Sequence, residues 1–269
     1  MTFIPVFLLI AQDERTSRHN NLKLAVEFGT NYASTGLVKP EQIRENHSQG
    51  HFSGDYYYDF GHFGEYTDVK TTYFGIKPEL FFLKNRIGIA SGLRFSIARS
   101  YLISDRDVFL WRVKEEGLNT EYVRINEIQH QSYLVGIPLE IRHFINRREL
   151  PIQTYFKIGA SFNYRIQAKN MIHFTNKAME KYDEIVQNQL PNGNDFSVFF
   201  FGAVGFKIGR YKEGRWNPWG NIEFQFPHFL LTNDAFPFAE QINDINFPGG
   251  GFQVSFQIPI GKNVPIGSN

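Results

Sequence analysis

The chain has 269 residues, a formal net charge of +1 and no cysteine. The near-neutral charge gives no electrostatic sign of nucleic-acid binding, and the lack of cysteine excludes disulfides, thiolate metal sites and cysteine nucleophiles. Aromatic residues make up 16% of the chain, which favours β-strands. The mean hydropathy is −0.33, and the sequence has no apolar run of about 18 residues, so no transmembrane helix is expected. Membrane β-barrels leave only a weak hydropathy signal.

An apolar run from Phe3 to Ala11 opens the chain and is followed by polar residues. Such a run is typical of the hydrophobic region of a secretory signal peptide. Two features depart from that pattern. No Lys or Arg precedes the run, and cleavage after Ala11 would place Leu9, instead of a small residue, at position −3 of the cleavage site. We interpret residues 1–11 as a signal-peptide remnant, with an ordinary buried strand as the alternative.

Eight later segments alternate with period two between bulky apolar residues and small or polar ones. In the third segment, Ile87 and Phe95 share one face, whereas Gly88 and Arg94 share the other. This alternation is typical of strands with one apolar face. The segments are 22–32, 71–82, 86–98, 132–144, 152–166, 197–209, 220–226 and 250–260.

The connectors between these segments alternate between short and long. The short ones lie around 84–85, 146–151 and 212–217, and the long ones are 34–68, 99–128, 169–194 and 232–249. Short turns at one end and long loops at the other are typical of outer-membrane barrels. We predict an all-β fold over residues 20–261: an eight-stranded antiparallel up-and-down transmembrane β-barrel with short periplasmic turns and long extracellular loops. Residues 262–269 form a C-terminal tail.

The period alone does not decide which face lines the interior, because a soluble lipocalin-like barrel is apolar inside. Side-chain size does decide, since an eight-stranded barrel is narrow inside. Bulky residues occupy the apolar face of every segment, so we expect that face to point outward into lipid. The interior polar network is then predicted to carry a net charge of +3 from Lys23, Glu27, Lys77, Glu79, Arg94, Glu140, Arg142, Lys157, Arg165, Lys207 and Glu223. A salt-bridged plug is the favoured interpretation, and an anion-preferring pore is the alternative.

Several segments resemble the PorT-like outer-membrane β-barrel family of Bacteroidota. The resemblance is carried by "YFGIKPELFF", "RIGIASGLRFS", "FKIGASFNYRI" and above all the Tyr-Leu-x-x-Ile-Pro-Leu run from Tyr133 to Leu139. It spans roughly residues 20–260 and implies an eight-stranded barrel in the bacterial outer membrane. The family's namesake is tied to the type IX secretion system, and the resemblance implies no catalytic residue and no cofactor. The aromatic first loop and the helix-like third loop have no match in the family pattern.

Function on such a barrel is expected in the long loops. The first loop mixes aromatic and acidic residues, which suits protein or glycan binding, although aromatics packed over the barrel mouth are an equal alternative. The second loop reads as a hairpin of residues 108–113 and 120–128 around Glu116–Gly117. The candidate contact residues are Tyr56, Tyr57, Tyr58, Phe60, Phe63, Tyr66, Trp111 and Tyr122.

The third and fourth loops carry apolar residues of their own. A short amphipathic helix that packs on the barrel is predicted in the third loop, ending at Pro191–Gly193. The fourth loop, 232–249, is apolar for a loop, so it either folds inward or meets a partner. The apolar positions of the helix are Met179, Tyr182, Val186 and Leu190.

Two kinds of chemistry are weaker alternatives. The first-loop histidines His47, His51 and His62 match no metal-ligand spacing, so no metal site is predicted. His130 and Ser132 share one strand face near the long-loop rim, as the base and nucleophile of a lipid hydrolase would. The nearby Glu127 points to the other face unless the chain bends, and there is no G-x-S-x-G signature. The enzyme class therefore stays open but is not favoured, and no catalytic residue or cofactor is assigned.

These patterns favour a non-enzymatic outer-membrane barrel that is a structural or accessory component. It would present extracellular loops to a partner complex of the secretion or envelope machinery, a step that rests on the family resemblance. A stand-alone adhesion or ligand-binding barrel acting through residues 51–66 is the main alternative. A lipid-modifying enzyme and a small anion channel are further ones. The expected partners are outer-membrane lipid and outer-membrane proteins, not nucleic acid.

Overall fold

The computed structural model describes residues 22–44, 66–82, 86–104, 108–116, 119–145, 152–212, 215–240 and 249–259. These residues form one sheet of 11 antiparallel strands, in which eight strand positions close into a ring. The signal-peptide segment and the C-terminal tail predicted from the sequence lie outside the described residues. The predicted all-β, antiparallel and eight-stranded arrangement is confirmed.

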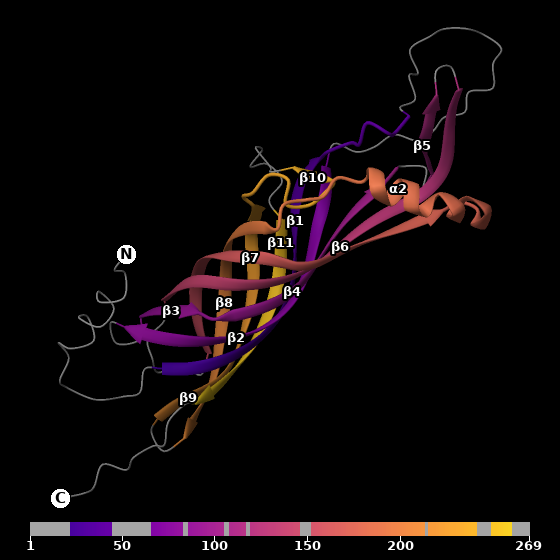
Figure 1. Ribbon diagram of the computed structural model, residues 1–269. Coiled ribbons are helices and arrows are strands. Elements are labelled where there is room, and N and C mark those ends of the chain that lie inside the picture. The colour runs from indigo at the N-terminus through magenta and orange to yellow at the C-terminus, as the bar shows by residue number, and fades with distance from the viewer. Residues whose placement is uncertain are drawn as a thin grey trace, which may run out of the picture.

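The strand ring closes because β1 pairs with both β2 and β11. Lys23 of β1 lies opposite Glu79 of β2 and opposite Pro259 of β11, so the two ends of the described chain lie at the same end of the ring. The strand ends that the short connectors join are at this end (Figure 1). In order around the ring the strands are β1 (Leu22–Leu37), β2 (Tyr66–Phe82), β3 (Ile87–Ser91) with β4 (Leu93–Ile103), β6 (Asn119–Phe144), β7 (Ile152–Phe174), β8 (Phe196–Lys212), β9 (Arg215–Leu230) and β11 (Gly249–Pro259).

β3 and β4 share one position of the ring, which the sequence predicted as a single strand over 86–98. The interruption falls at Gly92, where a Cβ would overlap the carbonyl oxygen of Ile76 and the Cα of Lys77. Glycine permits this close backbone approach. The pairing register on β2 is the same on both sides of Gly92, so the alternation of inward and outward side chains continues through the break.

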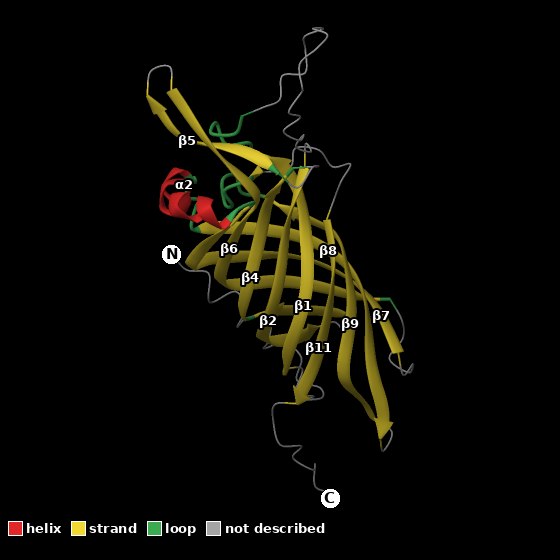
Figure 2. Cartoon of the chain, turned by 90° about the vertical axis from the view of Figure 1, so that its right-hand side faces the viewer, coloured by secondary structure: helices red, strands yellow, loops and turns green. Residues whose placement is uncertain are grey.

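β6 and β7 extend past the ring at the end of the long connectors, where β5 (Phe109–Glu116) pairs with β6 as a hairpin. The 3-10 helix η1 (Lys177–Tyr182) and the helix α2 (Asp183–Gln189) lie beside this hairpin (Figure 2). The predicted hairpin and the predicted helix are both confirmed. Neither of these two helices has the length or the apolar character needed to cross a bilayer, within the part of the chain that is described.

The hairpin and the helices share a hydrophobic core, and we call residues 109–116, 119–128 and 172–190 the platform. The predicted helix face packs here, in a core that joins the hairpin to Leu102 of the ring strand β4. Trp111 is fully buried, and its Nε1 donates a hydrogen bond to Gln189 Oε1 at 2.7 Å. Its prediction as a contact aromatic is therefore wrong, because its ring fills the interior. The core comprises Ile43, Leu102, Phe109, Trp111, Val113, Val123, Ile125, Ile128, Val186, Leu190 and Phe238.

The described part of the fourth long connector, residues 231–240, folds into the platform end of the strand ring. We call this end the mouth and these residues the inserted loop. Its Phe236 is buried against inward residues of the ring such as Phe199, with ring centroids 6.3 Å apart. The backbone N–H of Val38 donates to the carbonyl of Phe238 at 3.1 Å. The short strand β10 (Ala239–Glu240) pairs with β1. Of the two alternatives for this loop, these residues take the inward one.

Candidate functional site

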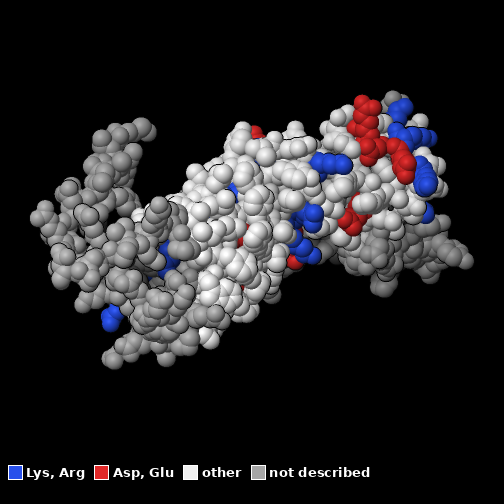
Figure 3. Space-filling view, turned by 90° about the horizontal axis from the view of Figure 1, so that it is seen from below, with Lys and Arg blue, Asp and Glu red and all other residues white. Residues whose placement is uncertain are grey.

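The outer face of the strand ring is apolar. Phe74, Ile158 and Phe226 have exposed fractions of 50%, 56% and 64%, whereas the inward Lys77 and Glu27 are fully buried. We call the outward residues the apolar belt. In Figure 3 the middle of the visible face is mostly white with only a few charged atoms, and most of the visible Lys, Arg, Asp and Glu gather toward the platform end. The belt includes Phe28, Phe74, Ile76, Leu93, Phe95, Ile137, Leu139, Ile141, Phe156, Ile158, Phe162, Phe200, Val204, Phe206, Phe224, Phe226, Phe252, Phe256 and Ile258.

Exposed amphipathic aromatics mark both edges of the apolar belt. Tyr32 and Tyr164 are exposed toward the platform end, and Trp219 is exposed toward the short-turn end. Beyond Tyr32 the surface becomes charged, because Lys70 lies opposite Tyr32 in register and Arg99 lies opposite Lys70. Tyr and Trp favour the boundary between an apolar phase and water.

Eight charged side chains meet inside the strand ring, and we call them the charge cluster. Four are carboxylates and four are cations, so the cluster is electrically neutral, and none is more than 3% exposed. They come from six of the ring positions, since β1, β2, β4, β6, β7 and β9 all contribute. The cluster consists of Glu27, Lys77, Glu79, Arg94, Glu140, Arg142, Lys157 and Glu223.

Glu140 is the centre of the charge cluster. Its Oε2 accepts from Lys77 Nζ at 2.6 Å and from Arg142 Nη2 at 3.1 Å. Its Oε1 accepts from Arg94 Nη2 at 3.3 Å and from Lys157 Nζ at 3.4 Å. One carboxylate therefore joins four cations from four strands. Charges so far from water need this density of partners, because an unpaired buried ion is costly.

The other three carboxylates bind the same cations from the far side. Glu27 Oε2 forms an ion pair with Lys77 Nζ at 2.6 Å, and Glu27 Oε1 accepts a hydrogen bond from Arg94 Nε at 2.7 Å. Arg142 donates to Glu79 at 2.5 Å and lies 3.0 Å from Glu223, which also pairs with Lys157. Each cation thus contacts at least two carboxylates. The cluster works as a set of cross-links between opposite walls of the ring.

Two buried tyrosines join the charge cluster, and sequence analysis did not single them out. Tyr155 donates to Glu223 Oε1 at 2.6 Å, and the Arg142 guanidinium lies 5.3 Å from the Tyr155 ring centroid. The Arg94 guanidinium lies 4.2 Å from the Tyr73 ring centroid, a cation–π contact. The alternation of the strands could have identified them. Tyr73 is four residues from Lys77 and Tyr155 is two residues from Lys157, so each tyrosine shares the inward face of its strand with a lysine of the cluster.

The remaining three residues of the predicted interior network flank the charge cluster, and Lys23 lies opposite Glu79 of the cluster in register. Lys23 and Lys207 approach the Phe81 ring, at 5.7 Å and 3.9 Å from its centroid, toward the short-turn end. Arg165 lies toward the platform end and pairs with Asp195 at 2.9 Å. Asp195 was not included in the predicted network, and its charge reduces the excess of positive charge expected there.

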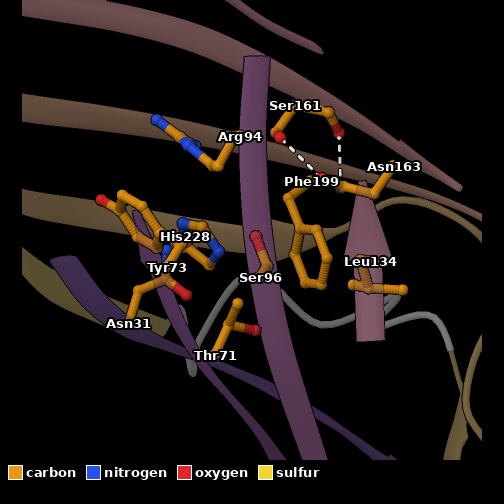
Figure 4. A pocket seen from close by; sticks show the side chains of 10 residues that line it. All are labelled: Asn31, Thr71, Tyr73, Arg94, Ser96, Leu134, Ser161, Asn163, Phe199 and His228. Atoms are coloured by element: carbon orange, nitrogen blue, oxygen red, sulfur yellow. Dashed lines mark hydrogen bonds between the residues drawn. The ribbon is translucent and has the colours of Figure 1, made fainter. Parts of the chain in front are cut away.

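A small cavity lies between Arg94 of the charge cluster and the apolar residues Leu134 and Phe199 (Figure 4). Its volume of about 10 Å³ is close to what a single water molecule needs. Asn31 Oδ1, Thr71 Oγ1 and His228 Nδ1 have no hydrogen-bond partner among the described residues and are suited to hold such a water. The cavity is lined by Asn31, Thr71, Tyr73, Arg94, Ser96, Leu134, Ser161, Asn163, Phe199 and His228.

The predicted loop contacts are placed only in part. Tyr122 is half-buried, and the Arg44 guanidinium lies 5.4 Å from its ring centroid. Tyr66 begins β2. The structure has no cluster of three or more metal-ligating side chains in its described ranges. Outside those ranges lie Tyr56, Tyr57, Tyr58, Phe60, Phe63, His47, His51 and His62.

No protein-family model and no curated protein sequence matches the chain. Its interpretation therefore depends on its own residues and geometry.

Proposed function

We propose that this chain is an integral outer-membrane β-barrel, closed by its charge cluster, that presents the platform to a partner protein as an accessory component of the envelope or secretion machinery. The observation that carries the proposal is the apolar belt. A water-soluble protein rarely exposes a large continuous apolar surface, whereas a closed strand ring with an apolar outer face satisfies its backbone hydrogen bonds within hydrocarbon.

The distribution of the connectors supports the outer membrane in particular. The strand ends joined by the short connectors and both ends of the described chain lie at one end of the ring, and the strand ends joined by the long connectors lie at the other. In outer-membrane barrels the short turns face the periplasm and the long loops face outside. The platform is then extracellular. The resemblance to the PorT-like family supports a link to secretion or the envelope.

The interior supports a structural role rather than conduction. An anion pore needs free cationic groups along an open, hydrated path. In the charge cluster the cations are paired with an equal number of carboxylates, and the cavity above it has room for about one water molecule.

The platform supports the proposal of a protein partner. It has a hydrophobic core of its own, so its surface is held in one shape, and a preorganised surface loses less entropy on binding. Its outer side chains include the exposed Arg112–Glu115 ion pair, at 2.7 Å, and Tyr182, which donates to Glu121. Charges of both signs suit a protein surface of mixed charge.

Quenching by brominated lipid tests the membrane position. In a variant that keeps Trp219 and replaces the other two tryptophans with Phe, we expect bromines in the acyl chains of vesicles to quench the emission strongly. A variant that keeps only Trp111, which is buried in the platform, is the matched control and should be quenched little. Purified protein that stays monodisperse in buffer without amphiphile would contradict the proposal.

Site-specific photo-crosslinking tests the partner. A photoreactive residue at Glu115, on the outer side of the platform, is expected to capture a protein of the outer membrane or cell surface in living cells. The same residue at Phe95, in the apolar belt, should capture lipid. Equal capture of one protein from both positions would contradict the assignment of the platform as the presenting surface.

A further inference from the structure

A serine, a histidine and an asparagine form a hydrogen-bonded chain at the mouth of the strand ring. Ser132 and His130 lie on β6, and His130 Nε2 is 2.8 Å from Ser132 Oγ. His130 Nδ1 is 2.7 Å from Oδ1 of Asn170, which lies opposite His130 in register on β7. The first two side chains point inward and are at most 3% exposed.

We infer that Ser132, His130 and Asn170 are the nucleophile, general base and orienting group of an acyl-ester hydrolase site. The amide oxygen of Asn170 accepts only if His130 Nδ1 carries the proton. That tautomer leaves the lone pair on Nε2 facing the Ser132 hydroxyl, which is the arrangement that activates a serine. Of the acidic neighbours, Glu127 lies on the opposite face of β6, so Asn170 takes the third place.

The environment of His130 favours the neutral base. Burial lowers its pKa below the ordinary value, an effect that the Asn170 hydrogen bond opposes and the nearby Arg165 charge reinforces. His130 lies beyond the apolar belt toward the platform end, where the next residue on β6, Gln131, accepts a hydrogen bond from the charged Arg99. Ser100 lies opposite His130 on β4, and its buried hydroxyl has no partner among the described residues. This hydroxyl is a candidate donor to an oxyanion.

The inserted loop covers this site and indicates what it binds. The Phe236 ring meets the His130 imidazole edge-on, with centroids 6.5 Å apart, and occupies an apolar hollow. If Phe236 withdraws, this hollow accepts a small apolar acyl group beside the Ser132 hydroxyl. The substrate class is therefore an ester of a short apolar acid that enters from the platform end. The hollow is lined by Val69, Ala98, Leu134, Phe199 and Leu230.

The reaction needs only the ester and water. Ser132 Oγ forms a bond to the carbonyl carbon as its proton moves to His130 Nε2. The carbon–oxygen bond to the alcohol then breaks, and His130 returns the proton to the departing alcohol. Water then attacks the carbonyl carbon of acyl-Ser132 as its proton moves to His130 Nε2. The bond from that carbon to Ser132 Oγ breaks, His130 returns the proton to Ser132 Oγ, and the acid is released. The site does not rest on the proposed function, because it requires neither the membrane nor the partner.

Labelling with a short-chain alkyl fluorophosphonate tests the site on the full chain in detergent micelles. We expect Phe236→Ala to raise the rate of labelling at Ser132 at least about 10-fold over the natural chain, because the hollow is then open. In that background, Ser132→Ala abolishes the labelling. His130→Gln slows it at least about 100-fold, the usual contribution of a general base. Asn170→Ala slows it about 10-fold, and Asn170→Asp restores it, since a carboxylate orients the same tautomer.

Ser197→Ala is the matched control, since Ser197 is another buried serine near the mouth with an unpartnered hydroxyl. It should leave the labelling rate unchanged. Phe236→Leu is a second, milder opening, and the heat-dependent mobility of folded and unfolded protein on gels establishes which variants are folded. The inference is overturned if folded Phe236→Ala and Phe236→Leu proteins both leave Ser132 unlabelled. It is also overturned if His130→Gln labels as fast as its parent.

Discussion

Removal of the charge at the centre of the charge cluster gives the sharpest test of how the interior is held together. Glu140→Gln keeps the size of the side chain and two of its hydrogen bonds but leaves the cluster with an excess of one positive charge. Breaking a buried ion pair usually costs about 3–5 kcal/mol. Each cation that touches Glu140 keeps another carboxylate: Lys77 and Arg94 keep Glu27, and Arg142 and Lys157 keep Glu223. We therefore expect the low end of that range, about 3 kcal/mol, rather than a sum over four contacts.

The assay is urea unfolding of the protein in detergent micelles, followed by tryptophan emission. Glu115→Gln is the control, because Glu115 belongs to an exposed ion pair with Arg112. Removing it should change the stability by less than about 1 kcal/mol. Adding Lys77→Met to Glu140→Gln restores neutrality, so the double variant should be more stable than Glu140→Gln alone. If Glu140→Gln unfolds at the same urea concentration as the natural chain, or if the double variant is the weakest, the electrostatic reasoning is refuted.

Three further predictions concern the apolar belt, the platform and the first loop. Ile158→Arg, in the middle of the belt, should destabilise the protein in lipid vesicles by about 2–4 kcal/mol, whereas Thr72→Arg at its polar edge should change little; refolding titrations measure both. Trp111→Ala should cost about 3–5 kcal/mol and melt the platform while the strand ring keeps its β-signal in circular dichroism. Replacement of residues 51–65 by a Gly/Ser linker should not change which partner protein is captured by a photoreactive residue at Glu115. Loss of that captured partner would favour the adhesion alternative.

Strand positions and their inward or outward faces follow from local sequence. The alternation in a segment such as 152–166 requires only a period of two, and the confinement of glycine and charge to one face indicates which face is crowded. The break at Gly92 was not predictable in this way. It depends on how closely the neighbouring β2 backbone approaches, and that is a property of the pairing and not of the segment.

The partners within the candidate sites are less predictable, because they depend on register. The sequence placed Glu140 and Arg94 inside, but their contact requires β4 and β6 to be aligned so that Arg94 faces Gly136. Asn170 is 40 residues from His130, and a shift of one residue in the β6–β7 pairing would separate the two. The sequence places Trp111 in a loop hairpin, where an aromatic residue is expected to be exposed for contact. Its burial depends on the packing of helix α2 against the hairpin, which the local sequence does not show.

The neutrality of the charge cluster bears on both proposals. A cluster with unpaired positive charge would attract anions and water into the ring, and it would also disfavour proton uptake by the buried His130 during catalysis. With the charges balanced, the cluster closes the ring and adds little net charge to the field at the mouth. The mouth can then hold apolar groups such as Phe236 beside a neutral histidine. Closure of the interior by ion pairs and an apolar mouth are therefore physically compatible in one narrow strand ring.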